Sequence, residues 1–433
     1  MKQWFEIQGG KPLEGTVTVS GAKNAAVAIV PATILCGECC ILENLPNIED
    51  VNILKEILIN IGADVSYTKG GCMRIDPSGI DQFSITFDMV SSLRASYYLL
   101  GAMLGRYGYA ELSLPGGCVI GQRPIDQHIK GMCALGAKVV QEDGLIKARA
   151  KKLTGAEIYF DVVSVGATIN VMLAAVLAEG QTILSNAAKE PHVVDVANFL
   201  NMMGAKVKGA GTDVIRITGV SRLHGCNYAI IPDQIEAGTF MIAAAATGGN
   251  VVIKNVIPTH LEAITAKLME SGATVVEGDD GREFFMQVTG CERPRAINIK
   301  TLPYPGFPTD LQQPMMSYLA KANGISIVME NIFEDRFNHV SELQRMGASI
   351  LLNGSTAMVE GRAQLGGAPL FASDLRAGAA LVIAALSAKG HSTIHNIEFI
   401  DRGYEYIEQK LSALGADIRR VNKETGEFRK EYI

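Results

Sequence analysis

The chain has 433 residues, of which 48% are hydrophobic and 19% charged, and its 39 basic and 45 acidic residues give a formal charge of −6. This length indicates two or more domains, the composition argues against disorder, and the charge balance argues against nucleic acid or an anionic membrane as a partner. The first residues lack a signal-peptide pattern, and apolar runs such as 25–36 are too short to cross a bilayer. The eight cysteines are therefore interpreted as free thiols of a cytoplasmic protein.

In chain order, the predicted elements form a sixfold repeat of about 70 residues. A helical stretch that ends in Gly-Ala and is followed by a strand-like segment occurs at 54–65, 128–140, 194–207, 261–276, 339–350 and 404–418. The glycine of each Gly-Ala pair suits a helix C-terminus that requires positive φ. These glycines are Gly62, Gly136, Gly204, Gly272, Gly347 and Gly415.

Each Gly-Ala helix is preceded by a second helix that is small and apolar on nearly every side, as in GAKNAAVAIVPATIL and SDLRAGAALVIAALSAKG. A helix of this composition should be buried all round, whereas the Gly-Ala helices have one charged face. One unit cannot cover its own buried helix, so several must pack around a shared axis. The predicted fold is α/β, with helices inside and sheets outside, and six units split into two domains of three near Pro232.

Function is expected where the repeats differ. The second unit has the longest insert between its two helices, and it contains the loop 114–124 with Cys118 and Arg123. A glycine-flanked loop of this kind is typical of a mobile lid, and Arg123 could lower the pKa of the thiol and hold an anion beside it. The alternative is an ordinary cysteine in a longer turn.

The buried helices also differ at their first turns, where charged residues follow candidate N-caps. Ser20 precedes Lys23 and Asn24, Ser91 or Ser92 precedes Arg94, Thr309 precedes Asp310, and Ser373 precedes Asp374 and Arg376. A charge buried without a partner costs several kcal/mol, so these residues should reach a surface, and helix N-termini attract anions.

The interpretation is an anion-binding cluster. Lys23, Arg94 and Arg376 supply the charge, and Asp310 is a lone carboxylate among them. Arg336 and Arg402 lie in later loops and could face the same cleft. The alternative is ordinary capping with surface salt bridges. Cys36, Cys39 and Cys40 include a C-x-x-C pattern, but no second pair or nearby His completes a zinc site, so they are interpreted as structural thiols.

Over essentially its whole length the sequence resembles the enolpyruvyl transferases, most closely the branch that acts on a nucleotide sugar. The likeness is carried by SGAKNAA (20–26), LRAS (93–96), LPGGCVIGQRPIDQH (114–128), DVVSVGAT (161–168), FPTDLQ (307–312), ASDLRAG (372–378) and DRGYE (401–405). The resemblance implies two inside-out α/β domains that close over the substrates. The first domain would hold residues 21–231, and the second residues 1–20 with 232–433.

The resemblance also implies an activity. The enolpyruvyl group of phosphoenolpyruvate would move to the 3′-hydroxyl of UDP-N-acetylglucosamine with release of phosphate, the committed step towards peptidoglycan, with no metal or organic cofactor. Lys23, Arg123 and Arg402 would hold the phosphate, and Arg336 and Arg376 the carboxylate. Asp310 would act as the base, and Cys118 as an acid that can also form a covalent adduct. Asp374 would assist the second proton transfer.

The family pattern places the nucleotide sugar against a further set of residues. They are Asn24, Arg94, Arg123, Pro124, Ile125, Asp126, Gln127, Ser164, Val165, Gly166, Asp310 and Ile332. The chain departs from some relatives at Val162 and Gln234, near the expected nucleotide side.

Three alternatives stay open. The same reaction could use another hydroxyl acceptor such as shikimate 3-phosphate, or the chain could be an inactive regulatory paralogue. A cysteine hydrolase is the third, and it would need His128 as the partner of Cys118. The sequence does not determine an oligomeric state.

Overall fold

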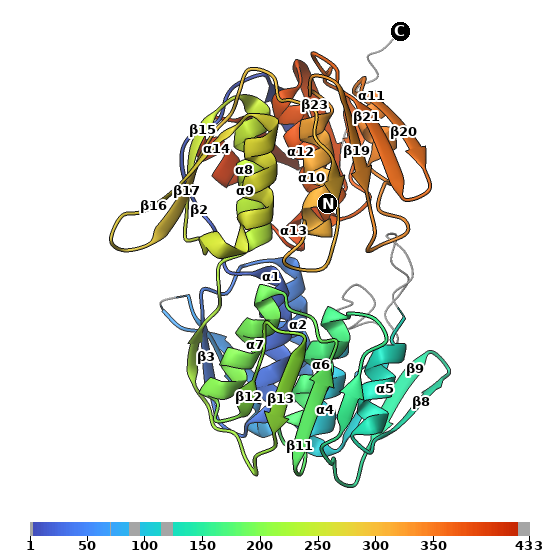
Figure 1. Ribbon diagram of the computed structural model, residues 1–433. Helices are drawn as coiled ribbons and strands as arrows, with labels where there is room; N and C mark the ends of the chain where they lie inside the picture. The colour runs from blue at the N-terminus through green and yellow to red at the C-terminus, as the bar shows by residue number, and fades with distance from the viewer. Residues whose placement is uncertain (1–2, 70, 86–95, 114–123, 423–433) are drawn as a thin grey trace. The chain divides into compact units, whose positions relative to one another are not determined.

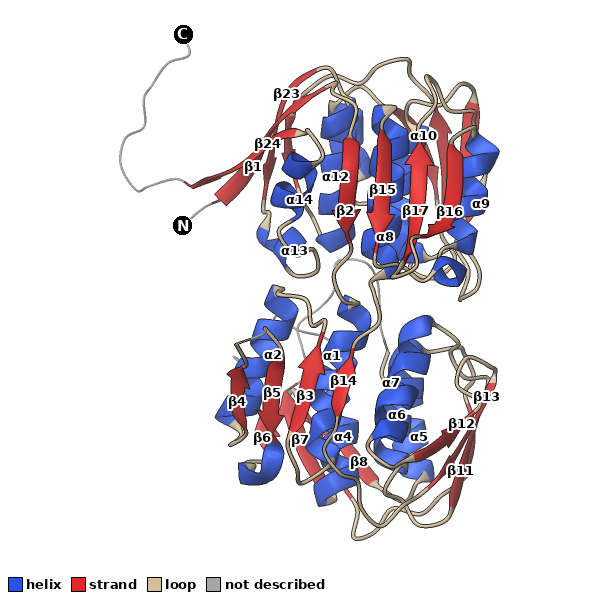
Figure 2. Ribbon diagram, turned by 90° about the vertical axis from the view of Figure 1, so that its left-hand side faces the viewer, coloured by secondary structure: helices blue, strands red, loops and turns tan. Residues whose placement is uncertain are grey.

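The computed structural model describes residues 3–69, 71–85, 96–113 and 124–422 (Figure 1). In these residues the strands form six four-stranded sheets, which lie outside the central helices of each half of the chain (Figure 2). Every sheet has the same pattern, in which one edge strand runs parallel to its neighbour and the other two pairings are antiparallel. The alternation of inside helices and outside sheets confirms the predicted fold class.

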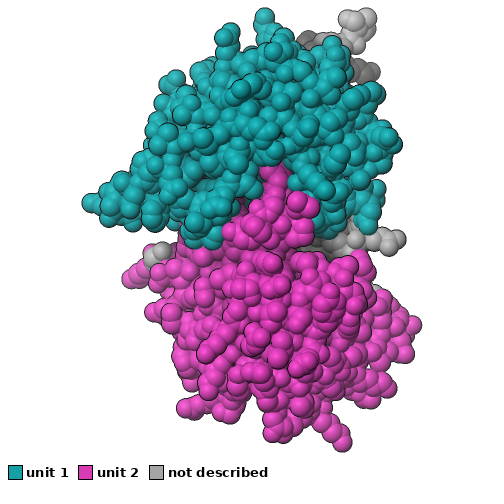
Figure 3. Space-filling model, viewed as in Figure 1, with its two compact units in different colours: residues 1–18, 235–301, 309–433 teal, residues 19–234, 302–308 magenta. Residues whose placement is uncertain are grey.

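The chain divides into two compact units (Figure 3). Unit 1 comprises Met1–Thr18, Ile235–Thr301 and Thr309–Ile433, and unit 2 comprises Val19–Gln234 and Leu302–Pro308. The boundaries fall between residues 18 and 19 and between residues 234 and 235. They differ by two or three residues from the predicted boundaries at 20/21 and 231/232. The segment Leu302–Pro308, which prediction grouped with residues 232–433, belongs to unit 2.

Three of the sheets belong to unit 2. In strand order they are β14 (Asn227–Ala229), β3 (Cys40–Glu43), β5 (Met73–Asp76) and β4 (Asp64–Tyr67); β6 (Ser84–Ile85), β7 (Tyr109–Ser113), β9 (Leu145–Arg149) and β8 (Lys138–Glu142); and β10 (Glu157–Tyr159), β11 (Gln181–Ser185), β13 (Val214–Thr218) and β12 (Lys206–Lys208).

The other three sheets belong to unit 1, and the two N-terminal strands complete two of them. In strand order they are β22 (Pro369–Phe371), β23 (Gly390–His395), β1 (Gln3–Gly9) and β24 (Asp417–Asn422); β16 (Thr274–Asp279), β17 (Phe284–Thr289), β15 (Asn250–Lys254) and β2 (Glu14–Thr18); and β18 (Ile299–Lys300), β19 (Ile325–Met329), β21 (Thr356–Glu360) and β20 (Ser349–Asn353).

The apolar helices form the centres of the units, as predicted. They are α1 (Lys23–Ala32), α4 (Tyr97–Tyr107) and α6 (Val165–Ala175) in unit 2, and α8 (Gln234–Thr247), α10 (Gln312–Leu319) and α12 (Leu375–Ser387) around the centre of unit 1. Small side chains let these helices approach closely. A Cβ added to Gly101 in α4 would lie 2.2 Å from the carbonyl oxygen of Asn170 in α6. None of the described helices is long and apolar enough to cross a bilayer.

The Gly-Ala helices are the outer helices of the repeats. They are α2 (Glu49–Asn60), α5 (Asp126–Ala134), α7 (Pro191–Met202), α9 (Glu262–Ser271), α11 (Val340–Arg345) and α14 (Ile407–Ala413). All six predicted glycines follow them with positive φ, from 89° at Gly415 to 108° at Gly62. This outcome confirms the register of the repeat along the whole chain.

We expect Gly101→Ala to destabilise unit 2 by about 1–3 kcal/mol, because the new methyl group would overlap the backbone of α6 and the two helices would have to separate. Calorimetric unfolding of the variant and the wild type checks this. Gly144→Asn is the matched control, because Gly144 has φ 74° and no atom within 4 Å of an added Cβ, and asparagine tolerates that conformation. Equal stability of Gly101→Ala and the wild type would contradict the close helix packing.

Candidate active site

A carboxylate lies between two buried guanidinium groups in unit 1. Asp310 belongs to the short helix η5 (Thr309–Leu311), which leads directly into α10. Its Oδ1 accepts a hydrogen bond of 2.8 Å from Arg336 Nη2, and its Oδ2 one of 2.9 Å from Arg376 Nη2. Arg336 is 2% exposed and Arg376 is 4% exposed. The structure thus brings together three predicted residues that lie up to 66 positions apart in the chain.

This arrangement fixes the charge of the carboxylate. Burial alone would raise the pKa of Asp310, but the guanidiniums of Arg376 and Arg336 outweigh burial and hold the pKa well below its ordinary range. The group is therefore an anion at neutral pH. It can accept a proton only if the two arginines are drawn away from it or neutralised by another anion.

Arg336 retains donors that Asp310 does not use. Its Nε and Nη1 are buried and have no hydrogen-bond partner among the described residues. Its guanidinium also lies 5.1 Å from the centre of the Phe333 ring. A buried N–H group left without an acceptor costs about 1–3 kcal/mol, so these donors suit an anionic ligand that would satisfy them.

Asp374 caps the neighbouring helix α12. Its Oδ1 accepts hydrogen bonds from the backbone N–H groups of Arg376 (2.9 Å) and Ala377 (3.0 Å). The prediction of Ser373 as the cap was wrong, because α12 begins at Leu375 and Asp374 therefore occupies the N-cap position. Likewise, α1 begins after Ala22 with no side-chain cap, not at Ser20. The second oxygen of Asp374, Oδ2, lies 3.4 Å from Gln313 Nε2.

Sequence reasoning missed two residues that hold this part of unit 1 in place. Gln313 lies in α10, and its amide nitrogen donates to the backbone oxygen of Arg336 (3.3 Å) as well as contacting Asp374. A glutamine among apolar residues of a predicted buried helix was the available signal, because such a side chain needs partners.

Glu330 is the second missed residue, and it is 2% exposed. Its Oε1 accepts hydrogen bonds from the Thr301 hydroxyl (2.9 Å) and the backbone N–H groups of Ile332 (2.9 Å) and Phe333 (3.2 Å). Its Oε2 accepts one from the Thr309 hydroxyl (2.9 Å). The carboxylate thereby fixes the predicted ligand-contact residue Ile332 relative to Thr309, the neighbour of Asp310. No sequence pattern marks this role.

Arg402 ends the short helix α13 (Glu398–Asp401) in unit 1. The preceding carboxylate, Asp401, is held by Arg420 through hydrogen bonds of 2.8 and 2.6 Å, and the same guanidinium donates to Glu408 at 2.9 Å. The loop that carries Arg402 is therefore tied to β24. Arg402 itself is half-buried.

In unit 2, Lys23 is the first residue of α1. Its Nζ forms a 2.8 Å ion pair with Asp50, which is 1% exposed, and its backbone N–H donates to Asp233 at 2.9 Å. Asn24 follows it on the same turn. These contacts set the position of the ammonium group near the N-terminus of a buried helix.

Several other predicted contact residues of unit 2 lie at helix starts. Ser164 caps α6 and accepts the Ala167 N–H at 3.2 Å, so Val165 and Gly166 form the first turn. Pro124 and Ile125 precede α5, and Asp126 begins it. The side chain of Gln127 is buried and hydrogen-bonded to Asp161. Arg94, Cys118 and Arg123 lie outside the described residues.

His128 has its own partner within unit 2. Its Nδ1 lies 2.9 Å from Asn170 Nδ2, and burial lowers the pKa of the imidazole to about 4, so the ring is neutral at pH 7. The contact joins α5 to α6.

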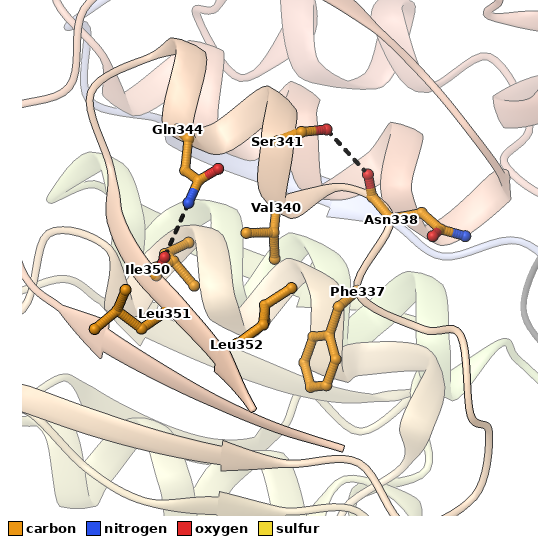
Figure 4. A pocket seen from close by; sticks show the side chains of 8 residues that line it. All are labelled: Phe337, Asn338, Val340, Ser341, Gln344, Ile350, Leu351 and Leu352. Atoms are coloured by element: carbon orange, nitrogen blue, oxygen red, sulfur yellow. Dashed lines mark hydrogen bonds between the residues drawn. The ribbon is translucent and has the colours of Figure 1, made fainter. Parts of the chain in front are cut away.

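A hollow of about 440 Å³ lies between α11 and β20 in unit 1 (Figure 4). Phe337, Val340, Leu351 and Leu352 supply most of its apolar lining, and no charged residue is among the described residues that line it. It contains none of the residues predicted for the site, so it is not the candidate site.

We expect Asp310→Asn to lower the midpoint of thermal unfolding at pH 7. Because the pKa of Asp310 is depressed by folding, its ion pairs contribute stability that is fully present above the ordinary carboxyl pKa, about 4, and is lost as the pH falls below it. The deficit of the variant should therefore shrink below about pH 4. Melting curves from pH 7 to pH 3 check this, with Asp335→Asn, an exposed carboxylate, as the control. A deficit that did not change with pH would contradict the ion-pair assignment.

Comparison with known proteins gives consistent results. A sequence model of the family of EPSP synthase (3-phosphoshikimate 1-carboxyvinyltransferase) matches residues 7–411. The chain is 57% identical to UDP-N-acetylglucosamine 1-carboxyvinyltransferase 3 of Caldanaerobacter subterraneus subsp. tengcongensis, over 97% of this chain and 99% of that protein. It is 56% identical to UDP-N-acetylglucosamine 1-carboxyvinyltransferase 2 of Bacillus subtilis (strain 168), over 96% of each chain.

Among solved structures, the enolpyruvyl transferase NikO from Streptomyces tendae superposes with a TM-score of 0.86 at 27% identity, over 98% of this chain and all of that chain. An EPSP synthase from Acinetobacter baumannii shares the fold, with a TM-score of 0.75 at 21% identity, over 97% of this chain and all of that one. The chain therefore belongs to the EPSP synthase family of enolpyruvyl transferases.

Proposed function

We propose that the chain transfers the enolpyruvyl group of phosphoenolpyruvate to the 3′-hydroxyl of UDP-N-acetylglucosamine and releases phosphate, as the committed step of peptidoglycan synthesis. The names of relatives at 56–57% identity over nearly the full length support this acceptor. The structural observation that carries the proposal is the carboxylate of Asp310 held between the buried guanidiniums of Arg336 and Arg376.

Phosphoenolpyruvate carries a carboxylate and a phosphate, and each requires cations. Arg336 and Arg376 would hold the carboxylate, the former through donors that Asp310 leaves unused. The bound anion would share the positive charge that now depresses the pKa of Asp310, so the pKa would rise towards that of an ordinary carboxyl group. Asp310 could then take the proton of the sugar hydroxyl, which makes the base active when the substrate is present.

The remaining groups divide the chemistry between phosphate binding and proton transfer. Lys23, Arg123 and Arg402 would hold the phosphate. Cys118 would give a proton to the methylene carbon while the sugar oxygen bonds to the neighbouring carbon, which yields a tetrahedral ketal. The second step breaks the bond to phosphate and removes a proton from the new methyl group, with help from Asp374.

Binding of the nucleotide sugar is assigned to residues near helix starts and loops. The backbone N–H groups of Val165 and Gly166, at the first turn of α6, suit an anionic diphosphate. The full proposed set is Asn24, Arg94, Arg123, Pro124, Ile125, Asp126, Gln127, Ser164, Val165, Gly166, Asp310 and Ile332.

The second candidate function is the same transfer to shikimate 3-phosphate, the reaction named in the description of the matching family. Phosphate release from phosphoenolpyruvate, measured with each acceptor separately, tests the two. Turnover with UDP-N-acetylglucosamine, but not with shikimate 3-phosphate, is the expected result. Preference for shikimate 3-phosphate would reverse the assignment, and no turnover with either acceptor would indicate an inactive paralogue.

We expect Asp310→Asn to reduce kcat by about 10²–10⁴-fold, because an amide cannot accept the hydroxyl proton. Steady-state phosphate release checks this. Asp335→Asn alters an exposed carboxylate next to Arg336 in the loop after β19, and it should retain wild-type turnover. Equal losses in the two variants would remove the support for Asp310 as the base.

We expect Cys118→Ser to impair turnover severely and to abolish covalent labelling by the epoxide fosfomycin, because a hydroxyl is a weaker acid and nucleophile than a thiol. Mass spectrometry of the labelled chain and a turnover assay check the two effects. Cys118→Asp should retain part of the activity, since a carboxylic acid can donate a proton, while still resisting the label. Full activity of Cys118→Ser would refute the acid role.

A further inference from the structure

A group of cysteines in unit 2 lies apart from the proposed chemistry. Cys36 follows the short helix η1 (Thr33–Leu35), and Cys40 begins β3. Their sulfur atoms are 3.7 Å apart, and both residues are fully buried. Within the described residues, no group of three or more His, Cys, Asp or Glu side chains could hold a metal ion.

Sheet pairing brings a third cysteine, distant in sequence, beside Cys40. Cys226 directly precedes β14, which pairs in parallel with β3 so that Asn227 lies opposite Ile41. The backbone oxygen of Cys226 accepts the Ile41 N–H at 2.9 Å. This register places Cys226 opposite Cys40. Neighbouring strands are about 4.8 Å apart, a spacing within the Cα range that disulfides adopt.

The thiols of Cys226 and Cys40 differ in exposure and in pKa, so one is suited to react first with an oxidant and the other to react with the product. Cys226 is partly exposed, whereas Cys40 is fully buried. Interaction with the Cys40 thiol lowers the pKa of Cys226, and the same interaction is the main cause that raises the pKa of Cys40 to about 12. Cys226 is thus the more reactive and accessible thiol, and its oxidation would remove the main cause of the raised pKa of Cys40.

We propose that Cys226 and Cys40 form a modification site that a hydroperoxide oxidises to a disulfide. The Cys226 thiolate attacks one peroxide oxygen, the O–O bond breaks, and the departing hydroxide takes up a proton, which gives a sulfenic acid and water. The sulfur of Cys40 then attacks that of Cys226, the S–O bond breaks, and the thiol proton leaves with the hydroxide as a second water. Two thiols and one hydrogen peroxide thus give one disulfide and two waters.

Strand β14 leads from this site towards the start of α1. Beyond β14, the Ile231 oxygen accepts the Ala22 N–H at 2.7 Å, and Asp233 accepts the Lys23 N–H at 2.9 Å. A covalent link between β3 and β14 would therefore attach β3 to the strand that leads to the contacts at the start of α1.

The test is to treat the full chain with hydrogen peroxide, alkylate the remaining thiols, and map peptides by mass spectrometry without reduction. We expect a cross-linked pair of peptides containing residues 40 and 226, lighter by two hydrogens than the separate peptides and lost on treatment with dithiothreitol. A sulfinic or sulfonic acid at Cys226 without the cross-link would overturn the proposal, and so would a disulfide that joins Cys40 to Cys36 or Cys39.

Matched variants separate the site from general thiol oxidation. Cys226→Ser changes a partly exposed residue, so the chain should fold, and the cross-link should disappear completely. Cys133→Ser removes an exposed thiol elsewhere in unit 2 and should leave the cross-link yield unchanged. A yield that survived Cys226→Ser, or that fell equally in both variants, would contradict the assignment.

Discussion

The pairing of Asp310 with Arg336 and Arg376 is the interaction on which the rest of the candidate site depends. Two guanidiniums at 2% and 4% exposure repel each other and are costly to bury, and the carboxylate that bridges them offsets that cost. Without the guanidiniums, burial would raise the pKa of the Asp310 carboxyl group. The three charges therefore stabilise one another, and the protonation state of Asp310 is set by burial and by the two guanidiniums together.

The repeat architecture explains why these charges meet at all. Asp310 lies immediately before α10 and Arg376 in the first turn of α12, two equivalent helices in successive repeats, and Arg336 lies in the loop that follows β19. Supporting hydrogen bonds hold these first turns in place, and the first of the following two connects separate repeats. Gln313 of α10 contacts Asp374 at the start of α12, and Glu330 binds Thr309 together with the loop that contains Ile332. A fold built from equivalent helices thus places chemically different first turns side by side within unit 1.

A structural feature could be predicted from the sequence when its physical cause lies in the residue itself or its immediate neighbours. The positive φ of Gly62 and its five equivalents was predictable because a helix end imposes it on the residue itself. The cap of α12 was not, since Ser373 and Asp374 are both good caps and the turn geometry chooses between them. Glu330 was invisible because its four donors come from three stretches of chain that only the tertiary fold assembles. The pairing of Cys226 with Cys40 needed the sheet register for the same reason.

The same charges bear on which substrates the site can accept. Removing one partner from a buried ion pair costs about 3–5 kcal/mol, so a ligand that draws Arg336 and Arg376 away from Asp310 must supply comparable attraction. A carboxylate can do so because it offers two acceptors and a full negative charge, and the unused Nε and Nη1 of Arg336 give it a place to start. A neutral analogue of the same shape would leave Asp310 paired and unable to accept a proton. In the proposed reaction, the charge required for binding is therefore also the charge that releases the base.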